Sequence, residues 1–236
     1  MRYLYSLIAV AALSCSALAL PVTPVVIQDQ LEIQNSADVI GDPDLFDIDY
    51  LKISSPNGNN LQVEIRFNFG GGTSLSPFTI PGFAPTLNVG DLLFRTANNN
   101  YAYVLRSHNG LVSNGLYQIS GTQTAQTVLG NPAGSYRNTA PVWADPNGAQ
   151  LLSTGSARIS TVNNRATNLL ATFIIPLSMS LVGEFNNGFD VYFTAATCGN
   201  DEVLGSVPGS EVPEPATWAM IGAGFLAIGL LRHRRN

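Results

Sequence analysis

Hydrophobic and polar residues alternate along much of the middle of the chain. The clearest run is 61–69, Leu-Gln-Val-Glu-Ile-Arg-Phe-Asn-Phe, in which five apolar and four polar residues alternate strictly. A period of two places one face of a strand in a core and the other in water, so this run predicts a β-strand. Residues 46–50 repeat the pattern, and the turn-forming residues at 55–60 predict that the two strands form a hairpin.

Further short apolar runs, rich in aromatic and β-branched residues, follow at 92–94, 101–105, 116–119, 157–162, 169–175 and 189–194. Asn-Gly pairs at 109–110, 114–115 and 147–148 separate several of them, and no ten-residue stretch of the middle has a helical period. We therefore expect an all-β fold over residues 20–202, an antiparallel β-sandwich that can take jelly-roll form. Residues 203–211, with two Gly, a Pro and two Ser, predict a linker.

Both ends of the chain carry uninterrupted apolar runs. Near the N-terminus one positive charge precedes an apolar stretch at 3–18, and Ala17 and Ala19 form the A-x-A pattern that signal peptidase cleaves. We therefore expect residues 1–19 to be a Sec signal peptide. A retained anchor helix and lipoprotein processing at Cys15 stay open as alternatives.

The second apolar run covers residues 217–231. Fifteen helical residues span about 22 Å, less than the roughly 30 Å of a bilayer's hydrocarbon core, so the run predicts a minimal transmembrane helix. Trp218 at one edge and the cluster Arg232, Arg234 and Arg235 at the other match the interfacial aromatic and positive-inside preferences. This pattern places the C-terminus in the cytoplasm.

A short motif, Val212-Pro213-Glu214-Pro215, precedes this run. The two prolines hold the backbone extended and keep it out of a helix, so Glu214 is presented beside the membrane surface. Motif, apolar segment and arginine cluster together resemble the PEP-CTERM sorting signal of Gram-negative bacteria, over residues 212–236. The alternative is a C-terminal anchor that no enzyme processes.

This resemblance implies a partner and a destination. PEP-CTERM signals are recognised by exosortase, an integral membrane enzyme of bacteria that export extracellular polysaccharide. The resemblance therefore implies Sec export, transient anchoring in the inner membrane, and a final place at the cell surface or in the extracellular matrix. The expected function is that of a structural protein associated with exopolysaccharide, and a carbohydrate-binding module delivered by the same route is the alternative.

Charge narrows the choice of partners. The 236 residues include 11 basic and 16 acidic ones, and charged residues make up 11% of the chain against 45% hydrophobic. Between the two ends 7 basic and 15 acidic residues remain, so the exported domain carries a net charge near −8. This excess of negative charge disfavours nucleic acid and anionic lipid as partners.

Candidate catalytic groups are few in the exported domain. His108 is its only histidine, and because it precedes the turn pair Asn109-Gly110 we expect a solvated loop side chain rather than a general base. Gly70-Gly71-Gly72 lacks the Lys-Ser/Thr of a phosphate loop and predicts a flexible strand exit. We expect no cofactor and no enzymatic activity, since a hydrolase would need a carboxylate pair in a cleft and no motif marks one.

Asp42, Asp44, Asp47 and Asp49 form the densest acidic cluster. Calcium takes several oxygen ligands from such a segment, but the spacing lacks the Gly and bidentate Glu of a calcium-binding loop. The four carboxylates are therefore either a calcium site or the solvent face of a strand, and we expect no other metal site.

Cys198 is the single cysteine left after signal cleavage, which excludes an intrachain disulfide. It opens the element Cys198-Gly199-Asn200-Asp201, which resembles an element found shortly before the tail in other PEP-CTERM proteins. We expect a packed thiol that closes the sandwich. An exposed thiol that forms an intermolecular bridge is the alternative.

Five aromatic residues in or near polar, Asn-rich segments are candidates for stacking on sugar rings: Tyr101, Tyr103, Tyr117, Tyr136 and Trp143. Packing in the core or on the surface is the other interpretation of each ring. A contiguous strip of exposed rings on one sheet face would favour carbohydrate binding.

Overall fold

The computed structural model describes residues 23–29, 42–130 and 136–209. All of them belong to one compact unit, Ala19–Ser210. The predicted signal peptide (1–19), sorting signal (212–236) and transmembrane helix (217–231) lie outside the described residues. Within the described ranges, no helix is long and apolar enough to cross a membrane.

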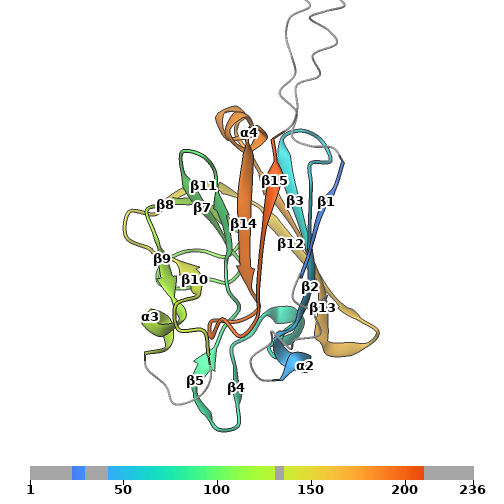
Figure 1. The fold of residues 1–236 in the computed structure, drawn as a ribbon, viewed down its shortest axis with the longest axis vertical. Coiled ribbons are helices and arrows are strands. Elements are labelled where there is room, and N and C mark those ends of the chain that lie inside the picture. Colours follow the sequence, from blue (N-terminus) through green and yellow to red (C-terminus); the bar gives the residue numbers. More distant parts are fainter. Residues whose placement is uncertain (1–22, 30–41, 131–135, 210–236) are drawn as a thin grey trace, which may run out of the picture. The chain divides into compact units, whose positions relative to one another are not determined.

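One sheet has five antiparallel strands in the order β1-β2-β3-β13-β12 (Figure 1). Their bounds are Val25–Gln28 (β1), Ile48–Ser54 (β2), Asn60–Asn68 (β3), Arg165–Pro176 (β13) and Ser156–Val162 (β12). The strand predicted at 61–69 is confirmed, because every second residue of β3 is buried, and β2 pairs with it as a hairpin. Asn163 and Asn164 both have positive φ in the turn from β12 to β13, a backbone form that suits tight hairpins.

The other sheet has six antiparallel strands in the order β11-β8-β7-β6-β14-β15. Their bounds are Gln150–Thr154 (β11), Gly115–Ile119 (β8), Asn100–Val104 (β7), Leu92–Arg95 (β6), Gly188–Thr194 (β14) and Glu202–Pro208 (β15). The linker predicted at 203–211 was wrong, because β15 occupies most of it. Gly205 permits a close approach rather than flexibility, since a Cβ there would lie 2.5 Å from Ile27 Cγ2 of β1.

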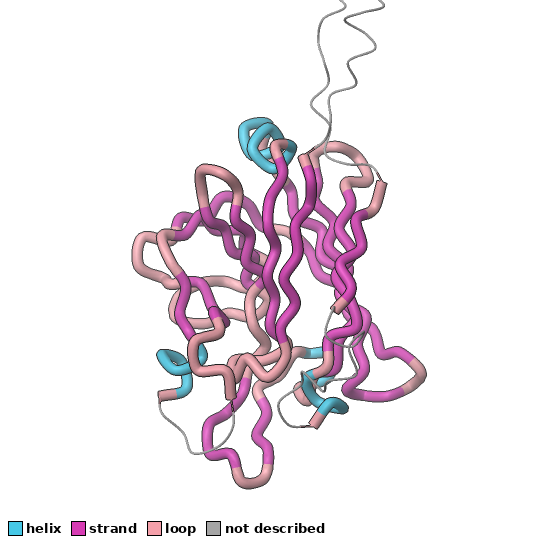
Figure 2. The backbone as a smooth tube through the Cα atoms, viewed as in Figure 1, coloured by secondary structure: helices cyan, strands magenta, loops and turns pink. Residues whose placement is uncertain are grey.

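Two hairpins and several short helical segments complete the unit (Figure 2). The hairpins are β4 (Phe78–Ile80) with β5 (Phe83–Leu87), and β9 (Thr122–Thr124) with β10 (Pro141–Ala144). The helices are α2 (Pro43–Phe46), α3 (Ala125–Leu129) and α4 (Met179–Asn186), and residues Gly72–Ser74 form a 3-10 turn. Asp42 caps α2 by accepting from Asp44 N at 3.0 Å, and Thr124 caps α3 by accepting from Thr127 N.

The two sheets pack face to face, and the main hydrophobic core lies between them. Phe67 of β3 meets Phe193 of β14 edge-on with ring centroids 5.4 Å apart, and Tyr103 of β7 meets Phe173 of β13 at 5.7 Å. Each such pair adds about 0.5–1.5 kcal/mol beyond simple burial. The all-β, antiparallel sandwich expected from the sequence is thus the fold observed.

The chain passes from the six-stranded to the five-stranded sheet at Gly155, the single residue between β11 and β12. A Cβ at this position would lie 2.2 Å from the carbonyl oxygen of Ile174, so the bend requires glycine. Gly155 N also donates to Asn114 O at 2.7 Å. The bend joins the two sheets on this side of the sandwich, while β1 packs against β15 on the other.

Candidate functional site

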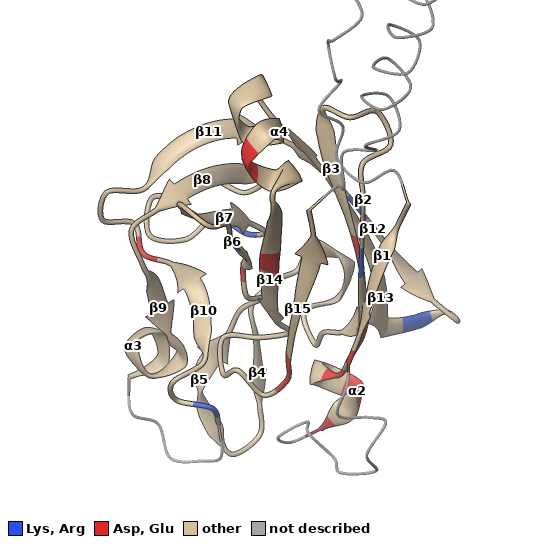
Figure 3. Ribbon diagram, turned by 45° about the horizontal axis from the view of Figure 1, so that its top comes forward, with Lys and Arg blue, Asp and Glu red and all other residues tan. Residues whose placement is uncertain are grey.

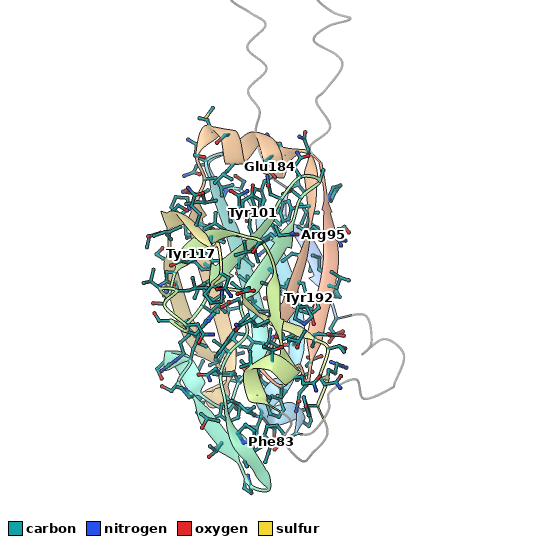
Figure 4. The ribbon with its side chains drawn as sticks, turned by 90° about the vertical axis from the view of Figure 1, so that its left-hand side faces the viewer. Phe83, Arg95, Tyr101, Tyr117, Glu184 and Tyr192 are labelled. Atoms are coloured by element: carbon teal, nitrogen blue, oxygen red, sulfur yellow. The ribbon has the colours of Figure 1, made fainter. Side chains whose placement is uncertain are left out.

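The outer side of the six-stranded sheet carries a second, smaller hydrophobic core. Leu93, Ala102 and Tyr117 lie next to one another across β6, β7 and β8. Ala144, at the end of β10, packs over them. Figure 4 looks at the molecule from this side. The β9-β10 hairpin therefore covers part of a sheet face that would otherwise meet water.

A groove of about 330 Å³ opens beside this second core, between the β9-β10 hairpin and strands β6, β14 and β15. Its apolar lining includes Leu93, Ile119, Tyr192 and Leu204, and Leu204 is 63% exposed. Arg95 and Tyr192 both lie on this side of the molecule (Figure 4). An open, mainly apolar groove of this size is suited to a small ligand or one unit of a polymer.

Polar groups at the rim of this outer groove are paired with one another. Arg95 Nη2 donates to Asp190 Oδ2 at 2.6 Å, and Ser206 Oγ donates to Asp190 Oδ1 at 2.7 Å. The hydrogen bonds from Ser206 and Arg95 lower the pKa of Asp190. Tyr192 donates its hydroxyl to Glu202, and burial together with this bond raises the pKa of Tyr192. The groove therefore presents a protonated tyrosine and an ion pair, groups that can stack on a ligand and hydrogen-bond to it.

A hydrogen-bond network ties α4 to the turn between β6 and β7, at one end of the groove. Glu184 accepts from Thr96, from Asn99 at 2.9 Å and from Tyr101 at 2.6 Å (Figure 4). Partial burial acts to raise the pKa of Glu184, but these hydrogen bonds outweigh it and the pKa is lowered. Burial, and then the bond to Glu184, raise the pKa of Tyr101. The network holds the turn that brings Asn100 to the groove.

His108 is not the solvated loop histidine expected from the sequence. Its side chain is 6% exposed, its Nε2 lies 2.8 Å from Asp91 Oδ2, and its ring stacks on Trp143 with centroids 4.2 Å apart. Asp91 Oδ2 also accepts from Ala144 N at 3.0 Å, and burial raises the pKa of Asp91 although His108 opposes this. These contacts clamp the β9-β10 hairpin onto the six-stranded sheet, which is a structural role.

The aromatic candidates do not form a strip of exposed rings. Tyr101, Tyr103 and Tyr117 are at most 5% exposed, and the Trp143 ring is stacked in the clamp just described. Tyr136 is half-buried against the core. Each ring therefore packs within the fold. Two tyrosines line the outer groove: Tyr101, which was a candidate but is only 2% exposed, and Tyr192, which was not among the candidates.

The four aspartates proposed for calcium have other partners. Asp42 caps α2, while Asp44 and Asp49 face arginine side chains at 3.7 and 2.5 Å. Asp47 also has a partner. Figure 3 shows acidic residues in red around α2. Among the residues that the structure describes, no three His, Cys, Asp or Glu side chains are arranged to hold a metal ion, so the geometry gives calcium no support.

The Cys198-Gly199-Asn200-Asp201 element joins β14 to β15. Cys198 is 1% exposed, and burial raises the pKa of its thiol to about 12. The packed thiol is therefore the interpretation that fits, and the exposed one does not. Asp201 is fully buried and accepts from Ile48 N of β2 at 2.5 Å, so this element links the six-stranded sheet to the five-stranded one.

Sequence reasoning missed the groove residues Arg95, Asp190 and Tyr192. In β14 the half-buried Asp190 and Tyr192 alternate with buried residues, and this alternation indicates that the two side chains share one face. Their meeting with Arg95 depends on the pairing of β14 with β6, which are 95 residues apart at this contact, and no local pattern marks that pairing.

Comparison with known proteins identifies the C-terminal segment. No curated protein and no solved structure matches the chain. Residues 211–235 match the family model described as the PEP-CTERM protein-sorting motif. This motif implies that exosortase is the processing partner and that the protein is exported and sorted to the cell surface. The chain is therefore a PEP-CTERM sorting domain-containing protein.

Proposed function

We propose that this protein is a non-enzymatic structural component of the cell surface or extracellular matrix, where it associates with exopolysaccharide. The observation that carries the proposal is the sorting motif at 211–235. In the domain that precedes it, buried polar groups such as Asp201 and His108 form hydrogen bonds within the fold. In this scheme a Sec signal at 1–19 directs export, and the apolar run 217–231 anchors the chain in the inner membrane until exosortase acts.

The internal links of the β-sandwich suit a protein that must persist outside the cell. The bond from Ile48 to Asp201 spans 153 residues, and that from Tyr101 to Glu184 spans 83. Proteolysis of a folded domain requires local opening, and links between distant segments make such opening rarer. These contacts support a durable scaffold, which is what a matrix component needs.

Localisation in the native host tests the proposal. Replacing both Pro213 and Pro215 with alanine removes the extended motif, and Pro56→Ala in the exposed β2-β3 turn is the matched control. We expect the wild type and Pro56→Ala in the exopolysaccharide fraction, without residues 217–236 by intact mass, and the double variant in the inner membrane. Sorting of the double variant to the surface contradicts a role for the motif, whereas wild-type protein that is released free of exopolysaccharide contradicts the matrix function.

Carbohydrate binding in the outer groove is a second candidate function. Sugar rings have apolar faces and polar edges, and the groove pairs Tyr192 and Leu93 with a rim of Arg95, Asp190 and Asn100. The groove has room for about one sugar unit, and it offers the ring of Tyr192 rather than a strip of rings, because Tyr101, which also lines it, is only 2% exposed. We therefore expect weak binding of a single unit, repeated along a polymer.

A pair of tyrosine variants tests this second function. Tyr192→Ala removes the ring from the groove, and Tyr50→Ala is its control on the outer side of the five-stranded sheet, where Tyr50 donates to Glu64 as Tyr192 donates to Glu202. Retention of the full-length protein on immobilised host exopolysaccharide should fall for Tyr192→Ala alone. Equal retention of the two variants contradicts binding in the groove.

A further inference from the structure

A second hollow, which we call the Arg106 pocket, has a volume of about 390 Å³. It lies between the β7-β8 loop, the 3-10 turn and β12, next to the bend at Gly155. Its polar lining combines one guanidinium with hydroxyl and amide groups, from Arg106, Ser74, Ser107, Ser113 and Asn114. Among the described residues that line it there is no Asp or Glu.

Arg106 is half-buried, whereas Arg158, which also has no carboxylate partner among the described residues, is exposed. Nη1 of Arg106 donates to the carbonyl oxygen of Leu75 at 2.9 Å, but no carboxylate of the described residues lies within 4.0 Å of its guanidinium. Four other basic residues each face a carboxylate within that distance: Lys52, Arg66, Arg95 and Arg165. In a domain with 7 basic and 15 acidic residues, a half-buried arginine kept away from carboxylates is positioned for an external anion.

The glycine segment 70–72 helps to hold this arginine. It is not a free strand exit, because Leu75 closes a hydrogen-bonded 3-10 turn over it. Leu75 takes a left-handed backbone, with φ of 50°, and its carbonyl oxygen accepts from Arg106. A Cβ at Gly71 would lie 1.9 Å from Ser76 O, so the turn requires glycine there. The fold thus maintains a tight turn that fixes one edge of the guanidinium.

We propose that the Arg106 pocket binds the carboxylate of an acidic sugar, such as a uronic acid unit of an exopolysaccharide. With Nη1 held by Leu75, the remaining N–H groups of the guanidinium can pair with both oxygens of a carboxylate. The serine hydroxyls and Asn114 provide partners for sugar hydroxyls. Binding a phosphate dianion requires more positive charge than one arginine supplies, because the domain carries a net charge near −8. The choice of a sugar rests on the proposed matrix function, whereas the anion site does not.

Titration of the full-length protein in detergent, by calorimetry or ligand-observed NMR, tests the pocket. We expect glucuronate to bind at least about tenfold more tightly than glucose, because only glucuronate offers a charged partner to Arg106. Arg106→Gln should lower the affinity for glucuronate at least about tenfold. Arg158→Gln removes the same charge from an exposed position of β12 and should leave the affinity unchanged.

A second variant tests the pocket without removing Arg106. Ala157 is exposed and lines the pocket, so Ala157→Glu places a carboxylate where it competes with the ligand. Glucuronate binding should be lost while the melting temperature stays within a few degrees. Absent binding by the wild type, or unchanged affinity in both variants, overturns the proposal.

Two further outcomes separate the anion site from the source of its ligand. If acetate or phosphate binds as tightly as glucuronate, the assignment to an acidic sugar is overturned. If glucuronate binds as expected but acidic exopolysaccharide does not retain the protein, the pocket is supported and the proposed matrix function is contradicted.

Discussion

The outer sides of the two sheets differ in character. On the five-stranded sheet, Lys52 pairs with Glu64 at 3.5 Å and Arg66 with Asp49 at 2.5 Å, all partly exposed. On the six-stranded sheet the equivalent side carries the second hydrophobic core, which lies partly under the β9-β10 hairpin, and the outer groove with its Arg95–Asp190 pair opens at the margin of this cover. One sheet therefore presents mainly paired charged side chains to water on its outer face, while the other has a partly covered outer face with a mainly apolar groove beside the cover.

This difference shows what an apolar pattern means in a sandwich. In β3 buried and half-buried residues alternate strictly, whereas Tyr101–Val104 of β7 are buried at four consecutive positions. Alternation indicates a strand that meets water on one face, and a continuous apolar run indicates a strand covered on both. The continuous apolar run at 101–105 therefore indicates that another element, here the β9-β10 hairpin, packs over the outer face of this strand.

Adding a negative charge to the outer side of each sheet should give the largest difference in stability between the two sheets. Ala102 is fully buried in the second core, so Ala102→Glu should reduce the free energy of unfolding by at least about 4 kcal/mol, because a carboxylate is buried without a partner. Gln62→Glu adds the same charge to the half-exposed outer side of β3 and should change stability by less than about 0.5 kcal/mol. If the melting temperatures of the two full-length variants lie within a few degrees of each other, burial of Ala102 under the β9-β10 hairpin is contradicted.

The next largest effect is expected where the two sheets are joined. Asp201→Ala leaves the buried N–H of Ile48 and the partly buried N–H of Glu202 without their acceptor and should lower the free energy of unfolding by about 3 kcal/mol. Asp201→Asn keeps one acceptor oxygen and should cost clearly less. Chemical denaturation of the two variants measures the difference. Equal losses would mean that the charge of Asp201, rather than its bond to β2, is what matters.

The sequence predicted the parts of the fold that depend on local pattern. Strict alternation at 61–69 identified β3, and the turn residues before it identified the hairpin with β2. The Asn-Gly pairs also lie in turns, where Asn109 and Gly148 have positive φ. The Pro-Glu-Pro motif was recognisable because its chemistry lies within a few consecutive residues, and the family match confirms it.

Features that depend on contacts between distant segments were not predictable in the same way. His108 precedes a turn pair, which indicates exposure, but Asp91 and Trp143 bury it from 17 and 35 positions away along the chain. Gly205 resembled a linker glycine, although its role is to admit Ile27 of β1. A residue type alone does not distinguish a flexible glycine from one that makes room for a neighbour.

Removing the clamp on the six-stranded sheet tests whether its cover opens independently. His108→Ala should lower the free energy of unfolding by about 2 kcal/mol. This is less than the loss of one partner of a buried ion pair usually costs, because burial raises the pKa of Asp91 and the carboxylate left behind can take up a proton. Hydrogen exchange should quicken in β9 and β10 and stay unchanged in β2 and β3. Uniform loss of protection in both sheets would contradict a local clamp.

The smallest effect, and the one with a pH signature, is expected at Glu184. Its pKa in the folded protein lies below the ordinary value of 4.5, so its hydrogen bonds stabilise the fold fully above that pH, and the contribution is lost as the pH falls through the lowered pKa. Glu184→Gln should therefore cost about 1 kcal/mol at pH 7, and the gap to the wild type should narrow below about pH 4.5. Glu64→Gln, on the outer side of the five-stranded sheet, controls for the lost charge. Thermal melts from pH 7 to pH 3 measure the gap, and a gap that stays constant over this range would show that packing of α4, rather than the charge on Glu184, holds the β6-β7 turn in place.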